Sequence, residues 1–171
     1  AFVILHYRAA DMTRKCVERI KALEGDKKIV IVDNASPNGT GQELLDEYTE
    51  DSEIKVILNP ENSGFAKGNN MGVRWVQENV PTDFVVVLNN DVEILQKDFC
   101  PKVEAIYRRH SFDVLGPDII SVFSGIHQNP KSLHGYSLES VRKKREKVAR
   151  TKNPILLLLS SGEKNSPAIW K

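Results

Sequence analysis

FVVVLNND, residues 84–91, is the stretch that decides the expected fold. Five consecutive apolar residues, three of them valine, predict a strand buried on both faces, as in parallel sheets. The run ends in two amides and a carboxylate. Because ligands of open α/β sheets lie just beyond the carboxyl ends of the strands, Asp91 is expected where it could hold a divalent cation over a phosphate. A polar turn that caps a strand explains this block equally well when it is taken alone.

An upstream block follows the same plan. IVIVDNASPNGT, residues 29–40, is a β-branched run that ends at Asp33 and continues into a turn of Ser, Pro, Asn and Gly. Asp33 is therefore expected at the carboxyl end of a strand, where it could accept a hydrogen bond from a ligand such as a nucleobase N–H. The turn, which contains Ser36, would shape the site. An Asx-type turn between a strand and a helix is an equally good interpretation of this block alone.

A second upstream block is rich in glycine and asparagine. NPENSGFAKGNNMG, residues 59–72, follows a predicted strand over 54–58 and is unlike an ordinary helix interior. Such a segment can bring backbone N–H groups close to an anion at a helix start, and Lys67 supplies its only positive side chain. The glycines form neither G-x-G-x-x-G nor G-x-x-x-x-G-K-[ST], which argues against dinucleotide and P-loop sites.

Predicted strands and helices alternate along the chain. Strands are expected at 2–6, 29–32, 54–58, 84–88 and 113–115, and helices at 11–23, 40–49, 66–79 and from Asp98 onward. Asp11 is expected to cap the first helix. The residues expected to face inward are, in the first helix, Met12, Cys16, Ile20 and Leu23, and, in the last helix, Phe99, Val103, Ile106 and Tyr107. The alternation predicts an α/β fold, a doubly wound and mainly parallel sheet flanked by helices.

Together the three blocks resemble the inverting GT-A glycosyltransferases, and most closely their rhamnosyltransferase-like bacterial members. Residues 31–40 are similar to the family run I-V-D-N-x-S-x-D-G-T, with Asn38 where aspartate is usual. Residues 62–72 are similar to N-x-G-F-A-x-G-N-N-x-G, and residues 88–91 to L-N-N-D. The resemblance implies a GT-A, Rossmann-like nucleotide-sugar-binding domain at 1–120. Residues 121–171 would be a loop-rich, basic helical extension belonging to an incomplete acceptor region.

The resemblance also implies a set of site residues. The donor would be a nucleotide-diphosphate sugar, and Asp91 would hold Mn²⁺ or Mg²⁺ against the leaving diphosphate. Asn89 replaces the first of the family's two carboxylates, so metal affinity without donor should be weak. The donor-binding residues would be His6, Tyr7, Asp33, Ser36, Asn62, Gly64, Phe65, Lys67, Asn69 and Asn90.

No residue matches the family's catalytic base, which lies in an acidic motif followed by aromatic residues and an arginine. We therefore name no catalytic residue, and we expect the chain to be truncated and to transfer sugar poorly by itself. The implied function is transfer with inversion to a saccharide or lipid-linked acceptor, in bacterial cell-surface polysaccharide synthesis. The alternatives are a nucleotide-sugar-binding module without catalysis and a sugar-phosphate nucleotidyltransferase. The latter class usually has a Gly-rich basic loop after its first strand, and HYRAA at residues 6–10 offers none.

Composition adds weaker constraints. A hydrophobic content of 40% and a charged content of 27% are typical of a globular domain, and a net charge of +1 indicates no nucleic-acid partner. Cys16 and Cys100 have no metal or disulfide spacing, which predicts free thiols and a cytoplasmic location. A predicted basic helix at 137–152 could make peripheral contact with the inner face of a membrane, although a solvated basic face explains its thin apolar stripe better.

Overall fold

The computed structural model describes residues 1–128, 139 and 142–143. These residues fall into two compact units, the first spanning Ala1–Ser111 and the second beginning at Phe112. The helices and strands discussed below all belong to the first unit. Within the described part of the chain, no helix combines the length and the apolar character needed to cross a bilayer.

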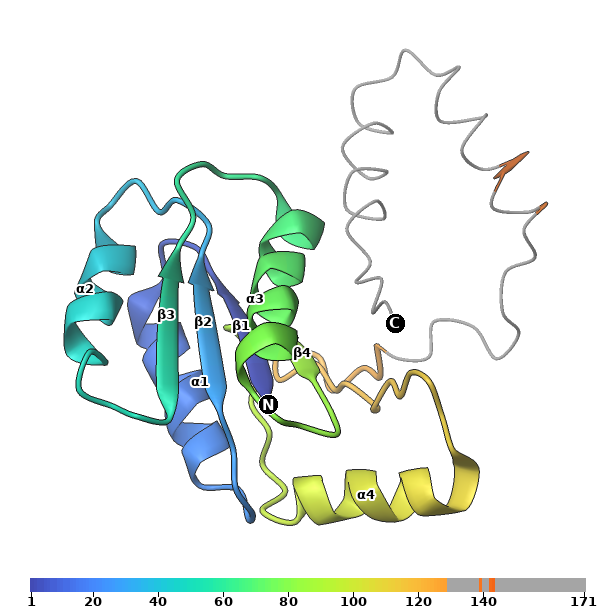
Figure 1. Ribbon diagram of the computed structural model, residues 1–171. Helices are drawn as coiled ribbons and strands as arrows, with labels where there is room; N and C mark the ends of the chain where they lie inside the picture. The colour runs from blue at the N-terminus through green and yellow to red at the C-terminus, as the bar shows by residue number, and fades with distance from the viewer. Residues whose placement is uncertain (129–138, 140–141, 144–171) are drawn as a thin grey trace. The chain divides into compact units, whose positions relative to one another are not determined.

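A parallel sheet forms the centre of the first unit (Figure 1). Its strands are β1 (Phe2–His6), β2 (Ile29–Asp33), β3 (Ile54–Leu58) and β4 (Val86–Asn89), in the order β3-β2-β1-β4. The register pairs His6 with Asp33, Asp33 with Leu58, and Leu5 with Asn89. The strands therefore end level with one another, at what we call the carboxyl edge. The predicted α/β fold with a parallel sheet is confirmed.

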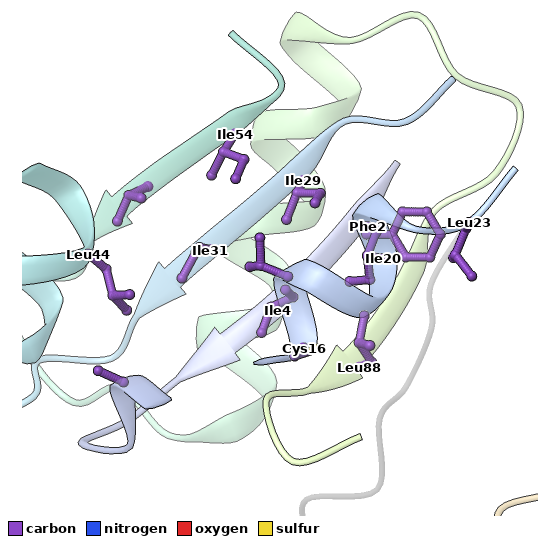
Figure 2. Packing of buried hydrophobic residues seen from close by; sticks show 13 residues of the cluster. Phe2, Ile4, Cys16, Ile20, Leu23, Ile29, Ile31, Leu44, Ile54 and Leu88 are labelled. Carbon is purple, nitrogen blue, oxygen red and sulfur yellow. The ribbon is translucent and has the colours of Figure 1, made fainter. Parts of the chain in front are cut away.

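Helices cover both faces of this sheet. The helices α1 (Ala10–Lys21) and α2 (Thr40–Glu47) pack on one face, and α3 (Phe65–Asn79) packs on the other (Figure 1). Figure 2 shows the first layer of the core, with Phe2, Ile4, Ile29 and Ile31 of the sheet against Ile20 of α1 and Leu44 of α2. The alternate side chains Val3, Val30 and Val32 pack on the other face with Val76 of α3. Burial on both faces explains why β1 and β2 are continuous apolar runs.

Gly72 sets how closely α3 approaches the sheet. A Cβ atom at this position would lie 2.5 Å from Val3 Cγ1 and 2.9 Å from Val32 Cγ2. Real side chains do not approach so closely, so only glycine allows the helix to lie at this depth. The close approach brings the first turns of α3, with their Gly and Asn residues, against the carboxyl edge.

The fourth strand corrects one sequence-based expectation. β4 begins at Val86 and pairs only with β1 among the described residues, so it lies at the edge of the sheet. Only Leu88 is buried, and Val86 and Val87 are partly exposed. The strand is therefore shorter than the predicted 84–88 and only partly buried, although Val86 packs against the core layer on one face and Val87 against the layer on the other. A valine run indicates an apolar strand but does not show whether a second strand pairs with it, and an edge strand leaves its side chains partly exposed.

The first helix corrects two further details. α1 begins at Ala10, so Asp11 lies in its first turn instead of capping it, and it forms an ion pair with Arg14 at 2.9 Å. Met12 was expected to face inward but is 54% exposed, and Thr13 is buried instead. Thr13 faces inward because its hydroxyl bonds to the side chain of His6.

The last described helix and the second unit differ from expectation as well. α4 (Phe99–His110) follows Asp98 as predicted, and Phe99 packs near Phe2 with ring centroids 6.4 Å apart. Ile106 and Tyr107 were expected to be inward but are 39% and 43% exposed. Residues 113–115 form no strand, and within residues 112–128 the only β pairing is an isolated antiparallel bridge, Ile120 to His127. Of the predicted basic helix at 137–152, only residues 139, 142 and 143 are described, and these are helical; the rest lies outside the described residues.

Candidate functional site

Polar side chains gather at the carboxyl edge. His6 is the last residue of β1, and Asp33 is the last residue of β2. Asn34 directly follows β2, and Asn59 directly follows β3. All four are buried, each no more than 6% exposed. Buried polar groups need hydrogen-bond partners, and most of those present here come from the loops that follow the strands. The edge thus carries a buried, hydrogen-bonded polar cluster built on the ends of three strands.

The Asp33 carboxylate is held by its own turn, residues 33–40. It accepts hydrogen bonds from the Ser36 backbone N–H at 3.3 and 3.2 Å and a short one from the Ser36 hydroxyl. The Asx-type turn considered from sequence is therefore present. A carboxylate has about four acceptor positions, so these bonds leave capacity for a ligand N–H.

The first turn of α2 packs directly on this carboxylate. A Cβ atom at Gly41 would lie 2.3 Å from Asp33 Cγ, so any other residue would displace the carboxyl group. The partial positive charge at a helix start favours an anion at this place. Ala35 and Arg8, in the loops that flank Asp33, have φ angles of 58° and 67°. A non-glycine residue in this left-handed region costs about 1–3 kcal/mol, and such strain concentrates at functional sites.

His6 is fully buried beneath the turn. Its Nδ1 lies 2.7 Å from Thr13 Oγ1, its Nε2 lies 2.9 Å from Thr40 Oγ1, and Nε2 lies 3.9 Å from Asp33 Oδ1. Burial lowers the pKa of His6, and this outweighs the opposite influence of the Asp33 carboxylate. Its predicted neighbour in the site, Tyr7, is 39% exposed and carries the guanidinium of Arg8 over its ring at 4.9 Å. Of this residue pair, Tyr7 is the one that presents its side chain to solvent.

A second network ties β2 and β3 to the start of α3. Asn34 Oδ1 accepts from Asn59 Nδ2 at 3.1 Å and from the Ser63 backbone N–H at 3.2 Å. Asn34 Nδ2 donates to Asn62 Oδ1 at 2.9 Å, and Asn62 Oδ1 also accepts from the Gly64 backbone N–H at 3.1 Å. The predicted site residues Asn62 and Gly64 are thereby fixed relative to the ends of the strands.

Asn69 has one polar atom that the protein does not pair. The residue is 5% exposed, and its Nδ2 donates to the Phe65 carbonyl at 3.1 Å. Its Oδ1 is buried and has no hydrogen-bond partner within the part of the chain that the structure describes. An unpaired buried acceptor costs about 1–3 kcal/mol, so a ligand hydroxyl or N–H bound there would relieve that cost. Lys67 is exposed on the same helix, and Phe65, which opens the helix, is half-buried.

Asp91 fits a cation that is shared with a ligand. It is exposed, and within the described residues no hydrogen bond or ion pair engages its carboxylate. No group of three or more His, Cys, Asp or Glu residues that could hold a metal occurs among those residues. Mg²⁺ and Mn²⁺ commonly take only one or two carboxylates and complete their shell with water and substrate phosphates, so a lone carboxylate suits such an ion. The adjacent Asn90 donates through Nδ2 to the Ala9 carbonyl at 3.3 Å and to Thr13 Oγ1 at 3.0 Å.

Sequence reasoning missed several residues of this edge. They are Thr13, Asn34, Thr40, Gly41 and Asn59, none of which was assigned to the site. Asn34 and Asn59 come directly after strands, and the rule that selected Asp91 would have found them. Thr13 gave no such signal, because its role depends on a contact between a helix and a strand end.

The chain matches known proteins over most of its length. Residues 1–161 match the family model "Glycosyl transferase family 2". The low-salt glycan biosynthesis hexosyltransferase Agl10 of Haloferax volcanii is 26% identical over 121 residues, which are 71% of this chain and 36% of that protein.

Crystal structures of S. aureus TarS (1–349), alone and in complex with UDP, superpose with TM-scores of 0.54 and 0.55. They are 18% and 19% identical, and each match covers 70% of this chain and 37% of the other, so they establish the fold alone. The chain spans little more than a third of the length of these relatives. Since the family model matches residues 1–161 of 171, the chain belongs to glycosyl transferase family 2.

Proposed function

We propose that this chain binds the donor of a sugar transfer, a nucleotide-diphosphate sugar, at the carboxyl edge of its sheet. The observation that carries the proposal is the Asp33 carboxylate, which is buried, held by Ser36 and still has acceptor capacity. Membership of a glycosyltransferase family supports it. The TarS structure in complex with UDP supports the choice of a uridine nucleotide as the first probe.

The nucleobase would bind at the turn of residues 33–40. A carboxylate that is shielded from water accepts an N–H strongly and penalises a base that lacks one, which gives selectivity. Asp33 would accept the base N–H, Ser36 would keep the carboxylate oriented, and the exposed ring of Tyr7 would lie beside the base. Uracil, thymine and guanine all offer such an N–H, so binding measurements must decide between them.

The sugar and diphosphate would extend from the base toward α3. Asn69 Oδ1 is a buried acceptor that suits a ribose hydroxyl. The start of α3 at Phe65, preceded by Gly64 and accompanied by Lys67, provides backbone N–H groups and a positive charge for the diphosphate. The polar network around Asn62 would hold this loop in a fixed shape and so reduce the entropy lost on binding.

Asp91 would hold Mn²⁺ or Mg²⁺ together with the diphosphate. Such an ion stabilises the negative charge that grows on the leaving diphosphate. With Asn89 in place of a second carboxylate, the protein alone would bind the ion weakly and the donor would complete the site. Asn90, anchored by Ala9 and Thr13, would fix the backbone that carries Asp91.

The finer parts of the proposal concern the reaction. We propose transfer with inversion to a saccharide or lipid-linked acceptor in glycan synthesis, which the match to a glycan biosynthesis hexosyltransferase supports. Residues 1–120 would form the donor-binding domain and residues 121–171 part of the acceptor region. No residue of this chain is assigned as the catalytic base.

Metal is expected to strengthen nucleotide binding. Calorimetric titration of the chain with UDP, dTDP and GDP should give a higher affinity for at least one of them with Mn²⁺ than with chelator. Asp91→Asn should abolish this difference and leave the affinity in chelator unchanged, because the base contacts remain. Asp26→Asn, a matched change at an exposed aspartate in a loop, should have no effect. Equal affinities with and without metal would remove Asp91 from the site, and binding of no nucleotide would overturn the proposed function.

A further inference from the structure

We propose that His6 is a positioning residue for the proposed base site: as a neutral ring with its proton on Nε2, it holds the turn of residues 36–40 and thereby orients Asp33. The proposal rests on the function proposed above, because it takes Asp33 as the base acceptor. It assigns His6 a role through its neighbours in place of a direct contact with the nucleotide. A continuous series of hydrogen bonds supports it, in which each proton has one consistent place.

The first half of this series fixes the proton on Nε2. Asn38 Nδ2 donates to the Arg8 carbonyl at 2.9 Å, so Asn38 Oδ1 is the atom that faces Thr40. The Thr40 hydroxyl donates its single proton to that oxygen at 2.8 Å. Thr40 Oγ1 can then only accept from the ring of His6, whose Nε2 lies 2.9 Å away. Nε2 is therefore protonated.

The second half leaves the ring uncharged. Thr13 Oγ1 lies 2.7 Å from His6 Nδ1 and accepts from Asn90 Nδ2 at 3.0 Å. Its hydroxyl can donate a hydrogen bond to Nδ1, because its other acceptor, the Ala9 carbonyl, already accepts from the Thr13 backbone N–H and from Asn90 Nδ2. Every donor and acceptor in this series of hydrogen bonds is then satisfied. The opposite tautomer would turn the Thr40 hydroxyl toward Nε2 and leave Asn38 Oδ1 without that donor.

The series of hydrogen bonds ends at the Ser36 hydroxyl, which holds the Asp33 carboxylate. The Arg8 carbonyl accepts from Asn38, and the Arg8 backbone N–H donates to Ser36 Oγ at 2.9 Å. The Ser36 hydroxyl in turn donates to the Asp33 carboxylate. A disturbance at His6 or Thr40 therefore reaches the base acceptor through bonded neighbours, without any contact between these residues and the ligand.

Charged groups reach His6 from three elements. Asp33 at the end of β2 and Glu43 on α2 favour a protonated ring, whereas Arg14 on α1 and burial oppose it. Asn90, which reaches the ring only through Thr13, is uncharged. The net effect is a lowered pKa of His6. Between the folded pKa and the ordinary value of 6.5, the ring is therefore protonated in the unfolded chain and neutral in the folded one. The stability contributed by neutral His6 is present above pH 6.5, its ordinary pKa, and is lost as the pH falls toward the folded pKa.

Protonation should also weaken nucleotide binding. The second proton would bind at Nδ1 and give the ring a positive charge, and this ring, with Nε2 3.9 Å from Asp33 Oδ1, competes with the base N–H for the carboxylate. His6→Gln keeps an amide donor for Thr40 but cannot gain a proton. Between about pH 7 and about pH 5 the wild-type affinity for UDP should fall relative to that of His6→Gln, a comparison that cancels protonation of the nucleotide itself. Parallel pH profiles would overturn the proposal.

The decisive test combines ring spectroscopy with a hydroxyl deletion. Ring nitrogen chemical shifts at neutral pH should show the Nε2–H tautomer, and Nδ1–H or a charged ring would contradict the proposal. Thr40→Val should weaken UDP binding on the order of tenfold, Thr40→Ser should restore it, and both proteins should keep cooperative unfolding. Thr49→Val, where the exposed hydroxyl bonds to the Leu45 carbonyl at 2.7 Å, should change nothing.

Failure of the proposed function can be told apart from failure of this inference. If the wild type binds no nucleotide, the proposed function is wrong, and the backbone amide shifts of residues 36–40 decide on the role of His6. Larger shifts in Thr40→Val than in Thr49→Val would support positioning of the turn by His6. Equal shifts, or full UDP affinity in Thr40→Val, would overturn it.

Discussion

Replacing Asp33 by alanine is expected to weaken the binding of UDP by about 1–3 kcal/mol. The change leaves the base N–H without an acceptor in a site shielded from water, and this loss corresponds to roughly 5- to 150-fold in affinity. The increase in affinity with Mn²⁺ should persist, because Asp91 lies on a different strand end. Calorimetric titration with and without chelator measures both quantities in one protein.

Ser36→Ala is the control for this prediction. It removes the hydroxyl that bonds to Asp33 but leaves the carboxylate and the backbone N–H, so its loss of affinity should be smaller. Thermal unfolding of both variants checks that the turn still folds. If Asp33→Ala abolishes the effect of metal and spares the affinity for the nucleotide, the ligand is bound in the opposite orientation.

Gly72→Val is expected to cause the largest loss of stability. Its Cβ atom would lie 2.5 Å from Val3 Cγ1, and its two methyl groups would need further space between α3 and the sheet. Overpacking of this kind typically costs about 1–3 kcal/mol, and the contact with two strands at once places this case at the upper end or beyond. The loss should exceed the gain in helix propensity from replacing glycine, which is about 1 kcal/mol for alanine and less for valine.

Urea unfolding measures this effect. The midpoint for Gly72→Val should fall well below that of the wild type, with Gly72→Ala between them. Glu78→Ala, an exposed change on the same helix, should alter the free energy of unfolding by no more than about 0.5 kcal/mol. An unchanged midpoint for Gly72→Val would mean that α3 does not lie as close to the sheet as described here.

The fold could be predicted because its signals are local. Runs of β-branched residues marked β1 and β3 at their observed bounds, and the alternation with helices predicted the parallel sheet. The edge position of β4 could not be predicted, because an apolar run is the same whether one neighbour covers it or two. The burial of Thr13 in place of Met12 was missed for a related reason. The polar partner that makes this threonine an inward residue, His6, lies on another element.

From the strand ends, the candidate site was predicted only where a charged group follows the strand; the residues of α3 and its preceding loop came from the family resemblance. Asp33 and Asp91 were selected by that rule, whereas the buried amides Asn34 and Asn59, which directly follow β2 and β3, carry no charge and were not selected. Whether a named residue faces a ligand or its own fold depends on tertiary contacts. His6 shows this, since its position at the end of β1 was predicted but its bonds to Thr13 and Thr40 were not.

The most direct test of the central claim is to map the bound nucleotide on the chain by backbone amide NMR. Titration with UDP should shift the amides of residues 33–41 and 62–70 in a saturable way, and Mn²⁺ added with UDP should broaden the signals around Asp91. This result would place the base, the diphosphate and the metal along one carboxyl edge. Saturable shifts centred elsewhere, for example on α4, or Mn²⁺ broadening remote from Asp91, would contradict the account.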